Sequence, residues 1–90
     1  MKTTHVIVQG RVQGVCFRDY TCRQARRLNL CGWVRNKDDG TVEAIFTGAE
    51  SDVTSMLEWL RQGSPGSRVD TVHCRDVTSE EDFTTFEIRY

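Results

Sequence analysis

The chain has 90 residues, of which 38% are hydrophobic, and its formal net charge at pH 7 is −1. This length suits one small domain over residues 1–90, and the balanced charge argues against a general nucleic-acid binder, which usually carries a clear basic excess. The sequence contains no apolar run of membrane-spanning length and no signal-peptide pattern. We therefore expect a cytoplasmic monomer with no nucleic-acid or membrane partner.

The first half of the chain predicts a strand, a helix and a hairpin. Apolar and polar residues alternate over residues 5–11, which predicts a strand, and apolar residues at helical spacing predict a helix over residues 18–28. Two further strands are predicted over residues 30–37 and 41–47. The turn signal at residues 38–40 lies between them, so these two strands should form a hairpin.

The second half of the chain predicts one more helix and two more strands. Apolar residues at positions i, i+3, i+4 and i+7 predict a helix over residues 52–62, which Gly63 ends. Strands are predicted over residues 68–77 and 83–90. The acidic segment 78–82 between them is predicted to be a mobile, solvated loop.

The order of these elements predicts the fold class. Strand, helix, strand, strand, helix and strand follow one another, with one added strand at the C-terminal end. This is the order of a split βαβ, ferredoxin-like α+β sandwich, with two helices on one face of a mostly antiparallel sheet. Proteins of this plan bind RNA, metals or amino acids, so the function has to be inferred from particular residues.

A glycine-rich segment over residues 10–18 joins the first predicted strand to the first predicted helix. Gly10 and Gly14 allow the backbone to curl tightly, and a curled loop at a helix N-terminus directs several N–H groups toward one positive spot. The guanidinium of Arg18 adds a planar fork that fits phosphoryl oxygens. The segment therefore predicts a site for a phosphate-like anion. The alternative is an ordinary strand-to-helix turn with an exposed arginine.

A second polar position lies on the second predicted strand. Asn36 follows Val34 by two residues, so its side chain should project from the same face. An amide offers both a donor and an acceptor, which suits it to hold a water molecule in one orientation. Thr41, just past the turn, could fix the Asn36 amide by a hydrogen bond. The alternative is that Asn36 only shapes the hairpin, as asparagine often does.

Several arginines lie on or before the first predicted helix. Arg23, Arg26 and Arg27 are on the helix and Arg11 precedes it. Helical arginines are usually at the surface, so these positions predict a solvated face. The alternative is a modest electrostatic steering of anions toward the neighbouring loop.

The four cysteines are Cys16, Cys22, Cys31 and Cys74. Their spacing matches no zinc site, and without a secretion signal a disulfide framework is not expected. We therefore expect four free thiols that act as small, partly buried hydrophobes, with no metal and no cofactor. Cys16 lies at the predicted helix start, where a nucleophilic cysteine is conceivable, but no histidine lies near it in sequence, which favours a structural role.

In its motifs the chain resembles the acylphosphatase family. The first family signature, Gly-Arg-Val-Gln-Gly-Val-x-Phe-Arg, is met at residues 10–18. The second signature, Gly-Trp-Val-x-Asn with a following Gly-x-Val, is met at residues 32–36 and 40–42. Gly-Ser-Pro-x-Ser-x-Val occurs at residues 63–69 and Phe-x-Ile-x-Tyr at 86–90, so the resemblance runs along the full chain in the same order.

The resemblance implies an enzyme that hydrolyses the carboxyl–phosphate bond of small acyl phosphates without a metal or cofactor, with inorganic phosphate as product inhibitor. It implies that Arg18 and the loop N–H groups bind the phosphoryl group, and that Asn36 orients the attacking water with support from Thr41. It also implies that the C-terminal carboxylate of Tyr90 steadies Arg18. The phosphate-binding residues implied in this way are Gln13, Gly14, Val15, Cys16, Phe17 and Arg18.

Two other functions stay open at this point. A non-catalytic phosphate-binding module would keep Arg18 and the loop but turn nothing over. An RNA-binding domain on a similar sheet would need exposed aromatic residues in mid-sheet, a pattern that the strand around Trp33 does not match.

Overall fold

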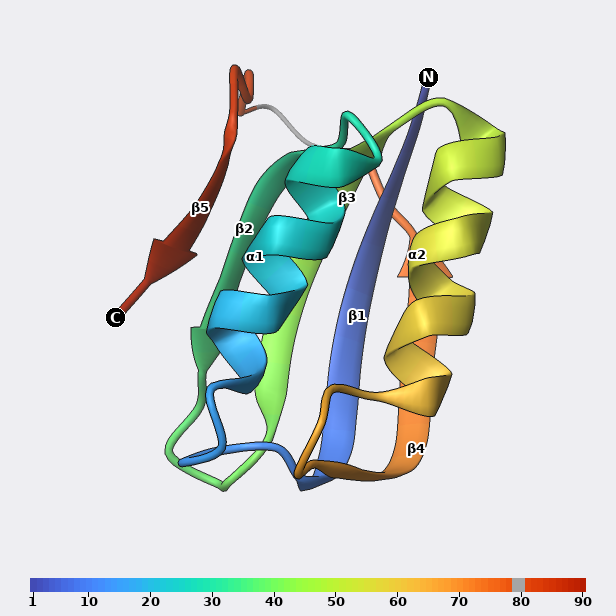
Figure 1. The fold of residues 1–90 in the computed structure, drawn as a ribbon. Coiled ribbons are helices and arrows are strands. Elements are labelled where there is room, and N and C mark those ends of the chain that lie inside the picture. The colour runs from blue at the N-terminus through green and yellow to red at the C-terminus, as the bar shows by residue number, and fades with distance from the viewer. Residues whose placement is uncertain (79–80) are drawn as a thin grey trace.

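The computed structural model describes residues 1–78 and 81–90, within which the chain forms two helices and one five-stranded sheet (Figure 1). The elements in chain order are β1 (Lys2–Arg11), α1 (Phe17–Arg27), β2 (Cys31–Asn36), β3 (Val42–Gly48), α2 (Glu50–Gln62), β4 (Arg68–Asp76) and β5 (Phe86–Arg89). The mobile acidic loop predicted over residues 78–82 includes residues 79–80, which lie outside the described residues.

The strand order in the sheet is β4-β1-β3-β2-β5, and all neighbouring pairs are antiparallel except β2 and β5, which run parallel. Both helices cover the same face of the sheet, and β5 lies at the edge beside β2 (Figure 1). The predicted ferredoxin-like α+β sandwich with an added C-terminal strand is therefore confirmed. The loop after β1 and the turn after β2 lie at the same end of the sheet (Figure 1), so their side chains can meet there.

The hydrophobic core lies between the sheet and the two helices and is built from the inward faces of both. Its buried members include Val6, Val8, Val42, Ala44 and Phe46 from the strands and Phe17, Ala25, Val53, Met56 and Leu60 from the helices. Full burial of one large apolar side chain stabilises a fold by about 1.5–3 kcal/mol. Phe86 of β5 also reaches this core, where its ring stacks on that of Phe46 at a centroid distance of 5.3 Å. The first residue of β5 is therefore anchored by packing.

Three elements differ from the prediction by at least two residues at one end, and the ends of the others differ by a single residue. β1 begins at Lys2 rather than at residue 5, because β3 pairs with it from Lys2 onward. α2 begins at Glu50 rather than at residue 52, and the acidic side chains of its first turn interact favourably with the helix dipole. β5 is shorter than the strand predicted over 83–90, because its parallel pairing with β2 covers only four residues.

The sheet face opposite the helices carries a group of charged contacts around Glu43. The Glu43 carboxylate accepts hydrogen bonds from His5 Nε2 at 2.7 Å and from Arg35 Nε at 2.6 Å. Burial by itself would raise the pKa of Glu43, but the hydrogen bonds from His5 and Arg35 outweigh it and lower the pKa below its ordinary value. The guanidinium carbons of Arg35 and Arg89 lie 5.3 and 5.2 Å from the centre of the Trp33 ring. This ring is engaged within the protein, unlike the free aromatic residues of RNA-binding sheets.

A carboxylate whose pKa is lowered by folding stabilises the fold fully above its unfolded pKa, and that contribution is lost as the pH falls through the folded pKa. We expect E43Q to lower the free energy of unfolding by about 1.5 kcal/mol at neutral pH, because hydrogen bonds to a charged group are lost. The difference between E43Q and the wild type should disappear in acid, where both side chains are neutral. Urea unfolding across a pH series measures it.

The matched control for this experiment is E87Q. The Glu87 side chain is on the same face but is 51% exposed and pairs with Arg89 at 3.0 Å, so its replacement should change stability little. A difference between E43Q and the wild type that stayed constant with pH would contradict the role assigned to Glu43.

Candidate active site

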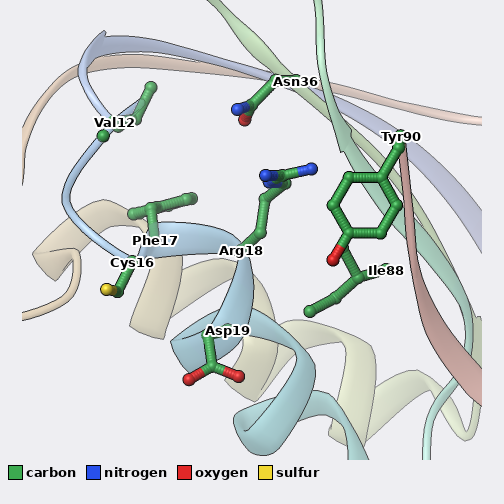
Figure 2. Close-up of a pocket in the computed structure, with 9 residues that line it drawn as sticks. Val12, Cys16, Phe17, Arg18, Asp19, Asn36, Ile88 and Tyr90 are labelled. Atoms are coloured by element: carbon green, nitrogen blue, oxygen red, sulfur yellow. The ribbon is translucent and has the colours of Figure 1, made fainter.

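A cavity of about 480 Å³ opens where the loop after β1 and the start of α1 meet the ends of β2 and β5 (Figure 2). Its lining residues are Val12, Gly14, Cys16, Phe17, Arg18, Asp19, Asn36, Ile88 and Tyr90. The predicted anion-binding loop and the predicted water-binding amide are therefore brought to one place. Val12, Asp19 and Ile88 were not among the predicted site residues, because apolar neighbours and exposed helical carboxylates carry no chemical signal in a sequence.

The start of α1 contributes backbone N–H groups to this cavity. The N-cap residue Cys16 has φ 60° and Gly14 has φ 76°, so both adopt left-handed conformations. Within the described residues no side chain caps the helix, and the Tyr20 N–H is the first to bond back, to the Cys16 carbonyl at 3.1 Å. The N–H groups of Phe17 and Arg18 therefore lack a helical partner. An uncapped helix start next to left-handed residues is a common form of anion site.

Gln13 fastens the loop to the turn after β2. Its Nε2 donates to the carbonyl oxygens of Lys37 and Thr41, each at 2.8 Å. These carbonyls flank the β2–β3 turn, so the loop is held beside Asn36. Gln13 and Val15 are predicted phosphate-binding residues, but neither lines the cavity. The Gln13 side chain is engaged by the turn, and Val15 packs against the core.

Arg18 is held by the end of β5. Its Nη1 donates to the Arg89 carbonyl at 3.2 Å, and its guanidinium carbon lies 4.8 Å from the centre of the Tyr90 ring. Figure 2 shows the guanidinium between Asn36 and Tyr90. The expected ion pair between Arg18 and the C-terminal carboxylate is not formed within the described residues, because the ring of Tyr90 faces the guanidinium instead. Tyr90 therefore contacts Arg18, but through its ring.

Asn36 ends β2, and its side chain points into the cavity (Figure 2). Its Oδ1 is buried and accepts no hydrogen bond in the described part of the chain. The hydrogen bond expected from Thr41 to Asn36 is not formed, because the Thr41 hydroxyl donates to Asp39 Oδ1 at 2.6 Å and the Thr41 N–H donates to the same oxygen at 3.0 Å. A charged acceptor two residues away competes successfully for that donor. These hydrogen bonds from Thr41 lower the pKa of Asp39.

The three arginines predicted to form a solvated face of α1, Arg23, Arg26 and Arg27, are all exposed, so that prediction is confirmed. Arg23 pairs with Asp19 at 3.0 Å. Arg26 has a further contact that was not predicted: it donates from Nε at 3.1 Å and from Nη2 at 2.9 Å to the Phe86 carbonyl. No sequence signal could reveal this contact, because its acceptor is a backbone carbonyl 60 positions further along the chain.

The four cysteines are free, with Cys16 and Cys74 exposed, Cys22 buried and Cys31 intermediate. The partly buried state predicted for all of them is wrong for Cys16 and Cys74, because one lies on a loop and the other on the edge strand β4. Across residues 1–78 and 81–90, no three His, Cys, Asp or Glu side chains group so as to hold a metal ion. No helix in the same part of the chain is long and apolar enough to cross a membrane.

Replacement of Gln13 by glutamate keeps the size of the side chain but removes both donors to the turn. We expect Q13E to lower the free energy of unfolding by about 2 kcal/mol, because each lost neutral hydrogen bond contributes roughly 1 kcal/mol. Inorganic phosphate should also bind more weakly, since the loop is no longer held and the added carboxylate repels the anion. Urea unfolding and an NMR titration with phosphate measure the two effects.

Q9E is the matched control, because Gln9 Oε1 accepts a hydrogen bond from Thr71 Oγ1 at 2.7 Å and a carboxylate can accept the same bond. If Q13E unfolded and bound phosphate like Q9E, the role of Gln13 as the fastening residue would be wrong.

Known proteins that resemble this chain in sequence and in fold include several acylphosphatases. A family model described as acylphosphatase matches residues 4–88. An acylphosphatase of Syntrophobacter fumaroxidans is 47% identical over 89 residues, which cover 99% of this chain and 92% of that protein. The crystal structure of acylphosphatase from Bacillus subtilis superposes with a TM-score of 0.95 at 40% identity over 100% of both chains. An acylphosphatase structure from Coxiella burnetii superposes with a TM-score of 0.93 at 36% identity over 98% of this chain and 92% of that one. The chain therefore belongs to the acylphosphatase family.

Proposed function

We propose that the protein hydrolyses small acyl phosphates to a carboxylate and inorganic phosphate in the cavity between the β1–α1 loop, β2 and β5. The observation that carries the proposal is a convergence on this cavity of three groups: a guanidinium, helix N–H groups without a helical partner, and an amide oxygen unpaired within the described residues. The first two suit a phosphoryl group and the third suits a water molecule. Membership of the acylphosphatase family supports the same reaction.

Arg18 and the backbone N–H groups at the start of α1 would hold the phosphoryl group. Arg18 directs one N–H to the Arg89 carbonyl, and since a guanidinium carries five, the others can bind phosphoryl oxygens. The helix dipole adds a positive potential at the same place. In phosphoryl transfer the developing charge spreads over the equatorial oxygens, so positioning and electrostatic stabilisation can supply most of the rate enhancement.

Asn36 would orient the water that attacks phosphorus. A buried acceptor without a partner costs about 1–3 kcal/mol, so the unpaired Oδ1 of Asn36 destabilises the fold, and a ligand that donates to this oxygen would offset that cost. The water oxygen forms a bond to phosphorus while the bond from phosphorus to the acyl oxygen breaks, and the leaving carboxylate keeps the electron pair. The proton of the water passes to an oxygen of the substrate itself, so this step requires no basic side chain. Thr41 would support Asn36 indirectly, because its hydrogen bonds to Asp39 shape the turn that follows.

The same groups account for further properties that we propose. Inorganic phosphate should inhibit as a product, because it would occupy the groups that bind the phosphoryl group of the substrate. Residues 1–90 would act as a single-domain monomer. The four free thiols favour a cytoplasmic location, where cysteines are kept reduced.

Hydrolysis of benzoyl phosphate in excess EDTA tests the proposed reaction. We expect R18A to lose about 10²–10³-fold in kcat/KM, the usual effect of removing one preorganised donor, and to be inhibited by inorganic phosphate much more weakly. N36A should lose rate while it keeps phosphate binding. R27A is the control, because Arg27 is exposed on the same helix and does not line the cavity.

Two outcomes would overturn parts of this proposal. Wild-type protein that binds inorganic phosphate but releases no benzoate would be a phosphate-binding module and not an enzyme. Loss of phosphate binding in a fully folded N36A would show that Asn36 binds the anion and does not orient the water.

A further inference from the structure

Two arginines of helix α1 donate hydrogen bonds to the two ends of β5. Arg18 Nη1 donates to the carbonyl of Arg89, the last residue of β5, at 3.2 Å. Arg26 donates from Nε and Nη2 to the carbonyl of Phe86, the first residue of β5, at 3.1 and 2.9 Å. The helix and the strand run in opposite directions (Figure 1), so the two arginines meet the strand in reverse order.

The spacing of the two arginines matches the spacing of the two carbonyls. Arg18 and Arg26 are eight residues apart on α1, which corresponds to about 12 Å of helix at 1.5 Å per residue. Phe86 and Arg89 are three residues apart on β5, which corresponds to about 10 Å of strand at 3.3 Å per residue. Both contacts can therefore form at once with the strand straight.

β5 is held by fewer strand pairings than the inner strands of the sheet, so its side-chain contacts matter more for its position. It is four residues long, lies at an edge of the sheet and pairs only with β2, in parallel. Parallel pairing is slightly weaker per residue than antiparallel pairing. The start of β5 is held by the ring of Phe86 in the core, by the Gly32 N–H, which donates to the Thr85 carbonyl at 3.0 Å, and by the contacts at the Phe86 carbonyl, where the Cys22 thiol also donates at 3.7 Å.

The other end of β5 orients Arg18. The Arg89 carbonyl and the Tyr90 ring contact the Arg18 guanidinium, which is only partly buried. A long side chain such as arginine loses much rotamer freedom when it is fixed in one place, so these two contacts decide where the guanidinium lies. Their position in turn depends on where β5 is docked.

We propose that Arg26 is a positioning residue for Arg18: by docking β5 it places the Arg89 carbonyl and the Tyr90 ring against the guanidinium that binds the phosphoryl group. This inference rests on the proposed function of Arg18. It assigns a role in the site to a residue that does not line the cavity. Arg26 would act on Arg18 through the position of the four-residue strand β5. This effect requires no change in the charge of the cavity.

The test compares R26A with the control R27A, which removes the same charge from the next residue of the same helix. We expect R26A to raise the Kd for inorganic phosphate and to lower kcat/KM for benzoyl phosphate by about 10-fold each, which is less than the roughly 10²-fold loss that a misplacement of about 1 Å can cause. R26K keeps the charge and one donor, so it should fall between R26A and the wild type. R27A should match the wild type.

A readout at Arg18 itself separates positioning from general loss of stability. The NMR signal of the Arg18 Nε–H reports its local order, and we expect it to broaden or shift in R26A but not in R27A. Addition of R26A to R18A should leave the Kd for phosphate unchanged from that of R18A alone, because Arg26 acts only through Arg18. Addition of R26A to N36A should raise the Kd by the same factor as in the wild type, because Asn36 lies on β2 and not on β5.

An unchanged Arg18 signal in R26A, or a further loss of phosphate binding when R26A is added to R18A, would overturn this inference. The Arg18 signal requires neither substrate nor turnover. Failure of the wild type to hydrolyse benzoyl phosphate would therefore overturn the proposed function, whereas the effect of Arg26 on Arg18 would be decided separately.

Discussion

The contact on which the candidate site most depends is the pair of hydrogen bonds from Gln13 to the carbonyls of Lys37 and Thr41. Without it, Arg18 at the start of α1 and Asn36 at the end of β2 would be joined only through the core and through β5, which contacts Arg18 and pairs with β2. A primary amide has two N–H donors, so one side chain can hold both sides of the turn. Because the amide is neutral, the loop is fastened without adding a charge that would weaken an anion site beside it.

The contacts around Arg18 likewise hold a side chain in place without adding a negative charge beside it. Within the described residues Arg18 forms no ion pair, and it is held by a carbonyl oxygen and by the face of an aromatic ring. Both attract a guanidinium, but neither cancels its positive charge as a carboxylate would. The arginine can therefore be oriented before an anion arrives and still attract it strongly. Arg89 at the end of the short edge strand β5 and Tyr90 directly after it supply these two contacts, so the position of the Arg18 guanidinium depends on how this segment is docked.

Much of this arrangement could be predicted from the sequence, and what could not has a common cause. Alternation and helical spacing predicted the sandwich, and the position of Asn36 two residues after Val34 predicted its orientation. The glycine-rich loop and Asn36 line one cavity, and anion binding there stays a prediction. The contacts of Arg26 and Gln13 could not be predicted, because their acceptors are backbone carbonyls, which every residue carries. The partner of Thr41 was predicted wrongly, because the choice between Asn36 and Asp39 depends on turn geometry.

A site that grips a phosphoryl group and directs water with Asn36 should break the substrate by attack on phosphorus and not on the acyl carbon. Hydrolysis of benzoyl phosphate in water enriched in oxygen-18, with both products analysed by mass spectrometry, tests this most directly. The proposed arrangement of Arg18 and Asn36 predicts the label in inorganic phosphate and an unlabelled benzoate. Label in the benzoate would contradict it, because the attacking water would then have been directed at the carbonyl group.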